Sequence, residues 1–148
     1  MYRRFTLALT VASLAMALMA GAVAANHFAT FTTSLSGAEE APGPGDPNGK
    51  GFATLDVYNA GLVCYTLKIQ GIEAPTAAHI HEVPIGEAGP VVVDLLINLA
   101  ERQGNRLTYC VNAPEAIAAD IRANPADYYV NVHNATYTGG AIRGQLGD

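Results

Sequence analysis

The chain has 148 residues, of which 13 are acidic and eight are basic, so its formal net charge is −5. This balance disfavours the classes of protein that bind nucleic acid or anionic lipid, because phosphate groups are held by clustered positive charge. The length suits one compact domain with its own hydrophobic core.

The N-terminus has the pattern of a secretory signal peptide. Arg3 and Arg4 form a short basic head, residues 5–21 are almost continuously apolar, and three small residues follow. An uncleaved membrane anchor is the alternative, but the apolar run is short for a spanning helix. We expect residues 1–24 to be removed on export, and residues 25–148 to form one secreted or periplasmic domain that is free of the membrane. Without its two arginines the domain has six basic and 13 acidic residues, and its formal charge is −7.

The first half of the mature chain has the pattern of strands and turns. Residues 26–36 are rich in threonine and aromatic residues, which favours a strand. Residues 38–49 are dense in proline, glycine, aspartate and asparagine, which favours a surface loop. Residues 51–58 alternate between apolar and polar side chains, and residues 62–69 return the chain after the turn at 59–61. This pattern predicts a β-hairpin.

The second half continues the short strands and adds one helix. Asn112 is predicted to cap the helix, with Pro114 in its first turn, and Asn124-Pro125 is predicted to end it. The other expected elements are a strand containing His79 and His81, a polar turn over residues 82–90, an apolar run over 91–97, a charged loop over 99–105, a strand over 106–111, and two strands within residues 128–146 joined at Gly139-Gly140. The whole pattern predicts an all-β fold, namely an antiparallel Greek-key β-sandwich or barrel of about eight strands with one short helix.

The chain contains two cysteines, Cys64 and Cys110, and each lies in an expected strand. An even number of cysteines in an exported chain predicts a disulfide, and closing a loop of this length contributes ~4 kcal/mol on the chain-entropy model. Two buried free thiols are the alternative.

Three of the four histidines lie in strand-like segments and suggest a metal site. His79 and His81 are two residues apart in a strand, so both project from one face, with Cα atoms roughly 6.5–7 Å apart. His133 in a later strand is the candidate third ligand. Imidazole nitrogens suit copper or zinc, and we expect copper because no thiolate or clear carboxylate completes the set. In the alternative interpretation these histidines join strands by hydrogen bonds to the backbone or to Asn131.

The fourth histidine suggests a second, weaker copper site. Cleavage after Ala24 exposes the sequence Ala25-Asn26-His27, which places a histidine at the third position from a free amine. The amine, two amide nitrogens and the imidazole of such a sequence can surround Cu(II) or Ni(II) in a square plane.

Three groups of motifs resemble the CHRD domain, the module first described in chordin, over nearly the whole mature chain. They are Leu35–Pro42, Ala78–His81 with Gly89–Val93 after it, and Tyr129–His133 with Gly139-Gly140 and Ile142–Leu146. The resemblance implies an extracellular β-domain of the single-domain, bacterial, secreted type. In chordin the module belongs to an antagonist of bone morphogenetic proteins. Ala141 departs from the family pattern, which usually has glutamate before Ile-Arg-Gly-Gln.

Further candidate structural or binding residues are Arg143, Glu40 and Asn131. Arg143 is expected either to anchor a carboxylate, with Glu40 among its possible partners, or to be a solvated arginine on an edge strand. Three tyrosines, Tyr128, Tyr129 and Tyr137, have two interpretations. They form either an aromatic binding face or ordinary core packing.

These observations predict a secreted, non-catalytic domain that binds copper through His79, His81 and His133. No catalytic residue is expected, since no serine follows Ser36 and no nucleophile motif is present. One alternative is an extracellular module that binds a protein or a glycan through its tyrosines or the loop at residues 39–49, with structural histidines. Another alternative is a copper oxidoreductase resembling superoxide dismutase.

Overall fold

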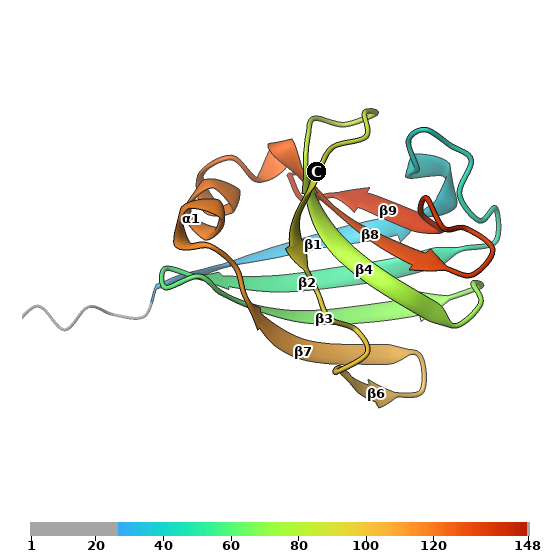
Figure 1. The fold of residues 1–148 in the computed structure, drawn as a ribbon, viewed down its shortest axis with the longest axis horizontal. Helices are drawn as coiled ribbons and strands as arrows, with labels where there is room; N and C mark the ends of the chain where they lie inside the picture. Colours follow the sequence, from blue (N-terminus) through green and yellow to red (C-terminus); the bar gives the residue numbers. More distant parts are fainter. Residues whose placement is uncertain (1–26, 148) are drawn as a thin grey trace, which may run out of the picture.

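A computed structural model describes residues 27–147 of the chain, and these residues form one antiparallel sheet of nine strands (Figure 1). The spatial order of the strands is β5-β4-β8-β9-β1-β2-β3-β7-β6. Their bounds are β1 (Phe28–Ser36), β2 (Lys50–Tyr58), β3 (Leu62–Gln70), β4 (Pro75–Glu82), β5 (Val91–Asp94), β6 (Glu101–Gln103), β7 (Arg106–Asn112), β8 (Tyr128–Asn134) and β9 (Ile142–Gln145).

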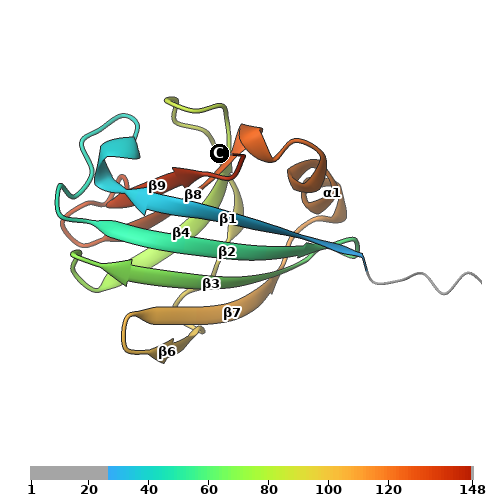
Figure 2. The same ribbon diagram turned by 180° about the vertical axis from the view of Figure 1, so that it is seen from behind.

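The sheet curls so that its two halves share one hydrophobic core, as Figures 1 and 2 show. Leu55 and Leu67 from β2 and β3 belong to the same fully buried cluster as Ile80 and Val130 from β4 and β8. Alternation along each strand produces this core, because every second side chain faces inward. The predicted all-β fold with one short helix is therefore confirmed, with nine strands in a single curled sheet.

The helix α1 (Glu115–Ala123) packs Ala118 and Ile121 inward. The predicted cap was wrong: Asn112 is the last residue of β7 and pairs with Leu62, so its side chain is not at the helix start. Pro114 occupies the N-cap position with no side-chain cap, while Asn124 ends the helix as expected.

The segment expected to be a charged loop contains β6, which pairs with β7 to form a hairpin at one edge of the sheet. All three side chains of β6 are exposed. A strand that buries neither face has no apolar alternation, and the sequence therefore did not indicate it.

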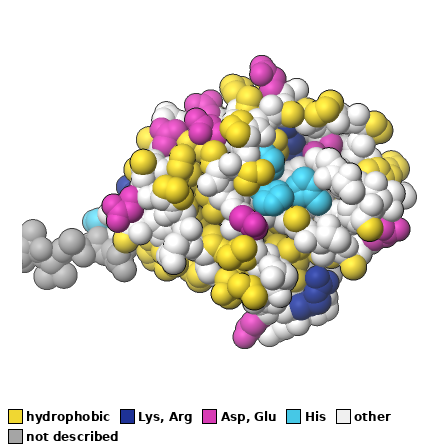
Figure 3. Space-filling model, in the orientation of Figure 1, with side chains coloured by type: hydrophobic (Ala, Val, Ile, Leu, Met, Phe, Trp, Pro, Cys, Tyr) yellow, Lys and Arg dark blue, Asp and Glu magenta, His cyan; other side chains and the backbone are white. Residues whose placement is uncertain are grey.

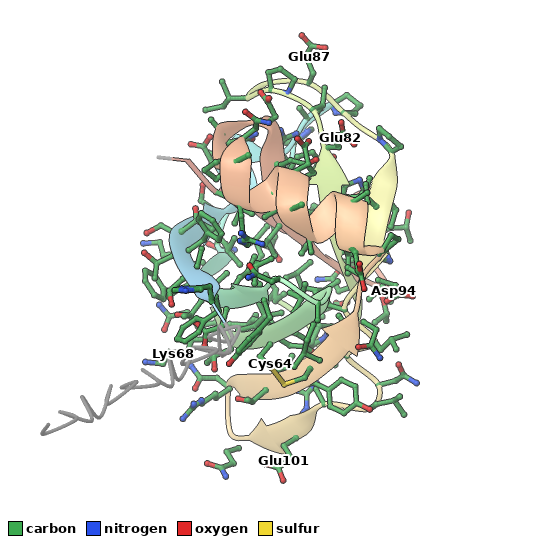
Figure 4. The ribbon with its side chains drawn as sticks, turned by 90° about the vertical axis from the view of Figure 1, so that its left-hand side faces the viewer. Cys64, Lys68, Glu82, Glu87, Asp94 and Glu101 are labelled. Atoms are coloured by element: carbon green, nitrogen blue, oxygen red, sulfur yellow. A yellow bond between two sulfur atoms is a disulfide. The ribbon has the colours of Figure 1, made fainter. Side chains whose placement is uncertain are left out.

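The predicted disulfide is confirmed. Cys64 in β3 lies directly opposite Cys110 in β7, and the bonded pair has its Cα atoms 4.0 Å apart. The bridge lies on the outer face of the sheet, since the neighbours Val63 and Tyr65 are buried in the core. Figure 4 shows the sulfur–sulfur bond beside the Cys64 label, at the lower strands.

The expected signal peptide and the start of the mature domain lie outside the described residues. Within residues 27–147, no helix has both the length and the apolar character needed to cross a membrane.

Two loops cover the outer face of β4, β8 and β9. The loop after β1 begins with the short 3₁₀ helix η1 (Gly37–Glu39), and its Asp46 amide donates to the Ala141 carbonyl just before β9. The loop between β4 and β5 is held from below by the Gln145 side chain, which donates to the Val83 carbonyl. This half of the sheet therefore has a second, partly buried layer in which polar side chains gather.

Candidate metal centre

The pairing of β4 with β8 brings the three predicted histidines to one face of the sheet. Ala78 and Ile80 of β4 point into the core, so His79 and His81 between and beside them point outward. In the same way Val132 of β8 points inward and His133 outward. Figure 3 shows histidine side chains gathered on this face of the molecule.

A small residue lets two of the rings meet. His133 lies opposite Ala77 in the register of β4 and β8, and Ala77 carries only a methyl group. The His133 ring leans across to His79, and its Nε2 atom lies 3.0 Å from the His79 Nδ1 atom. The His79 ring centroid is also 5.6 Å from that of His81. One ring nitrogen from each of the three histidines lies within 4.8 Å of the others.

Backbone carbonyls fix the tautomers of two of these histidines. The Nδ1 atom of His81 lies 2.9 Å from the Gly89 carbonyl oxygen, and Nδ1 of His133 lies 2.9 Å from the Thr138 carbonyl oxygen. A carbonyl oxygen can only accept, so each Nδ1 carries the proton and each Nε2 keeps its lone pair. Metal-binding histidines in proteins are commonly oriented by such a bond from the other ring nitrogen.

Two buried polar atoms beside these rings have no hydrogen-bond partner within the described part of the chain. One is His81 Nε2, in a side chain that is 8% exposed, and the other is the Oδ1 atom of Asn131, which is 2% exposed. Asn131 lies directly opposite His79 in the strand register. Buried polar atoms are normally paired, so these two acceptors are suited to bind an ion or a water.

The other predicted ligand, His27, is not in this cluster. It is exposed, immediately before β1, and its backbone carbonyl accepts from Asn59. The two residues before it lie outside the described part of the chain.

A family model described as CHRD domain matches residues 31–146. The chain belongs to the CHRD domain family. No curated protein and no solved structure matches the chain. The match covers nearly all of the described residues, including all three histidines of the cluster.

Arg143 of this CHRD domain is buried, which corrects the interpretation as a solvated arginine on an edge strand. Strand β9 lies between β8 and β1, and Arg143 is 1% exposed. Its guanidinium lies 3.4 Å from the centre of the Tyr129 ring, and the His81 ring stacks on Tyr129 with centroids 4.6 Å apart. Arg143 also donates to the Glu87 carbonyl. The arginine thus packs against Tyr129, on which His81 stacks, and its hydrogen bond to Glu87 holds the loop between β4 and β5.

The tyrosines do not form an aromatic binding face. Tyr128 and Tyr129 are both buried, on opposite sides of β8. Tyr137 is partly buried, and its backbone carbonyl accepts from the Gly140 amide in the β8–β9 connection. Core packing and stacking account for the two buried rings.

Glu40 reaches the same layer from the loop after β1. Its carboxylate lies 3.5 Å from the Asn131 side-chain nitrogen, and it fills the space above Gly140, where any Cβ atom would collide with it. Burial raises the pKa of Glu40 from 4.5 to about 7, although the Asn131 hydrogen bond and the positive charge of Arg143 act to lower it. Asn131, directly opposite His79, therefore lies between a buried carboxyl group and the histidine cluster.

His81 and His133 favour the neutral form. Burial lowers the pKa of His81 below its ordinary value of 6.5, and burial likewise lowers the pKa of His133. A neutral imidazole has the free lone pair that a metal ion needs.

Sequence reasoning did not find the second layer of this site. The Gly89 and Thr138 carbonyls are backbone groups, so no side chain marks them. The stack of His81, Tyr129 and Arg143 joins residues from three strands, and only the strand order brings them together. The spacing of His79 and His81 was the one clear signal for the site.

Proposed function

We propose that this CHRD domain is an exported, non-catalytic module that binds one transition-metal ion, copper in preference to zinc, through His79, His81 and His133. The observation that carries the proposal is the buried Nε2 atom of His81, which has no hydrogen-bond partner within the described residues and keeps its lone pair because Nδ1 donates to the Gly89 carbonyl. Export rests on the N-terminal sequence pattern.

The spacing of the nitrogens supports one ion. Metal–nitrogen bonds of about 2.0 Å place two neighbouring ligands about 2.8–3.3 Å apart. The 3.0 Å separation of His79 Nδ1 and His133 Nε2 falls in this range. Both atoms turn their lone pairs toward the ion when it binds, and the remaining proton of His79 then resides on its Nε2.

Copper is favoured by the donor set. The cluster offers three imidazoles, and within the described residues it includes no thiolate or carboxylate. Such nitrogen donors suit copper and zinc, and first-row metal affinity rises to its maximum at copper. Asn131 can accept a hydrogen bond from a water in a fourth position, which leaves its Oδ1 satisfied.

The surroundings support binding without catalysis. A catalyst acting on a small anion gains from an accessible positive charge near the metal. The nearest arginine, Arg143, is buried against Tyr129. Glu82 at the end of β4 and Glu87 on the adjoining loop are exposed, and Figure 4 shows both in the upper part of the molecule.

The test is calorimetric titration of the untagged mature protein with Cu(II), Cu(I) and Zn(II). We expect one copper per chain at the cluster, with at least a tenfold loss of affinity in each of His79→Ala, His81→Ala and His133→Ala. The matched control is His27→Ala, which should leave this site unchanged. Wild-type affinity in all three cluster variants would refute the proposal, and loss of binding only in His27→Ala would assign the copper to the N-terminus.

A further inference from the structure

A groove on the outer face of the sheet, in the half away from the histidines, curves over β9, β1, β2 and β3. It consists of two hollows of about 520 and 440 Å³ that share the residues Ser34, Ser36 and Phe52. Figure 2 shows these strands running side by side. We propose that this groove binds an acidic oligosaccharide, that is, a glycan chain carrying carboxylate groups.

An exposed aromatic ring lies in the middle of the groove. Phe52 is 41% exposed, and the register places it between Ser34 of β1 and Lys68 of β3. The ring is part of both hollows. A large apolar ring left open to water is available to stack on a flat apolar surface, and the C–H face of a sugar ring is such a surface.

Positive charge gathers at one end of the groove although the chain is acidic. Lys50 and Lys68 line the larger hollow, and Arg106 lies next to Lys68 in the strand register. These are three of the six basic residues among residues 27–147; no acidic residue lines the larger hollow, and Glu39 lines the smaller one. In Figure 4 Lys68 projects from the outer side of the sheet. This end of the groove therefore attracts an anionic substituent.

Four polar side chains complete the lining of the groove. Gln70 and Asn105 lie at the same end of the groove, and Ser34 and Ser36 lie along its floor. None of these four side chains makes a hydrogen bond within the described part of the chain. Amides and hydroxyls both donate and accept, as sugar hydroxyls do, so they can pair with a glycan in both directions.

The strand order favours a glycan over an acidic peptide. Within the groove no strand edge is free, because β2 and β3 are paired on both sides and the groove end of β1 is covered by β9, where Ser36 pairs with Arg143, so a peptide cannot add there as a further strand. A ligand in the groove can therefore bind only to side chains. A mixed set of hydroxyls, amides and one aromatic ring suits a sugar chain.

The experiment titrates the mature protein with three probes of similar length: hexagalacturonate, the neutral cellohexaose and hexaglutamate. Binding is followed by the amide NMR shifts of β1–β3. We expect hexagalacturonate to bind in the millimolar range or tighter, at least fivefold tighter than cellohexaose, and more weakly as salt rises. Tighter binding of hexaglutamate would overturn the glycan proposal, and so would the absence of shifts with hexagalacturonate.

Variants of exposed residues locate the site without threatening the core. Phe52→Ala and the double variant Lys50→Ala/Lys68→Ala should each weaken hexagalacturonate binding at least fivefold, whereas Phe52→Tyr should keep it. The matched controls are Phe28→Ala, an exposed ring at the far end of β1, and Arg122→Ala on α1. His79→Ala should bind the glycan normally, which separates this proposal from the metal site. Unchanged binding in both groove variants would overturn it.

Discussion

The Nδ1 atom of His79 lies 3.0 Å from the Nε2 atom of His133, although 54 residues separate the two in the sequence. The contact exists because β4 and β8 are neighbours, and because the residue opposite His133 is Ala77. Two features of the fold, one of topology and one of side-chain size, therefore create the centre of the proposed metal site.

The size of Ala77 offers a test that leaves every ligand in place. We expect Ala77→Leu to push the His133 ring away from His79 and to weaken copper binding about tenfold or more. The measurement is copper affinity by competition with a chelator of known affinity. Ala119→Leu on the exposed face of α1 is the control and should bind copper normally. An unchanged affinity in Ala77→Leu would show that the contact does not organise the site.

The disulfide should stabilise the fold without shaping the metal site. Cys64→Ala/Cys110→Ala should lower the free energy of unfolding by up to ~4 kcal/mol, because the unfolded chain gains the freedom that the bridge removes. Urea denaturation measures the change. The bridge lies on the outer face of β3 and β7, away from β4 and β8, so copper affinity should remain within twofold. A large loss of copper affinity would contradict this separation.

Glu40 should make the protein less stable as pH rises. Its folded pKa of about 7 exceeds its ordinary value of 4.5, so between these values the folded protein holds a proton that the unfolded chain releases. Stability therefore falls as pH rises through this window, by at most about 3 kcal/mol above pH 7, since each unit corresponds to 1.36 kcal/mol. We expect Glu40→Gln to raise the melting temperature at pH 8 and to change it little at pH 4.

The control for Glu40 is Glu39→Gln in the same loop, whose side chain is exposed. A melting temperature that rises equally at both pH values in Glu40→Gln would show that the effect is one of packing and not of protonation. The metal-free protein should be used, so that copper binding does not add its own pH dependence.

The copper-loaded protein should be a poor superoxide dismutase. The buried position of Arg143 and the exposed Glu82 and Glu87 disfavour the approach of an anion. Stopped-flow decay of superoxide should be no faster than with the same amount of copper bound to a simple peptide. Glu82→Gln/Glu87→Gln should change this little, because removing two negative charges does not expose Arg143. Fast decay in proportion to the copper content would contradict the non-catalytic proposal.

The sequence by itself determined the local structure. The alternation in β2 and β3 indicated which side chains form the core, and the spacing of His79 and His81 placed both on one face of a strand. The even cysteine count of an exported chain pointed to the disulfide. These properties repeat every two residues or depend on composition, so they are readable without knowing which strands are neighbours.

Only the tertiary structure decided the properties that depend on strand order. β9 lies between β8 and β1, and this position buries Arg143 against Tyr129 instead of leaving it in water. The fold also places the Gly89 and Thr138 carbonyls, in the connections that follow β4 and β8, beside the histidines and so fixes which nitrogens are free. It also gathers Lys50, Phe52 and Lys68 into one groove. No local pattern in the sequence records these contacts, because pairing between strands is chosen by the packing of the whole sheet and the connections between strands place backbone groups that no side chain marks.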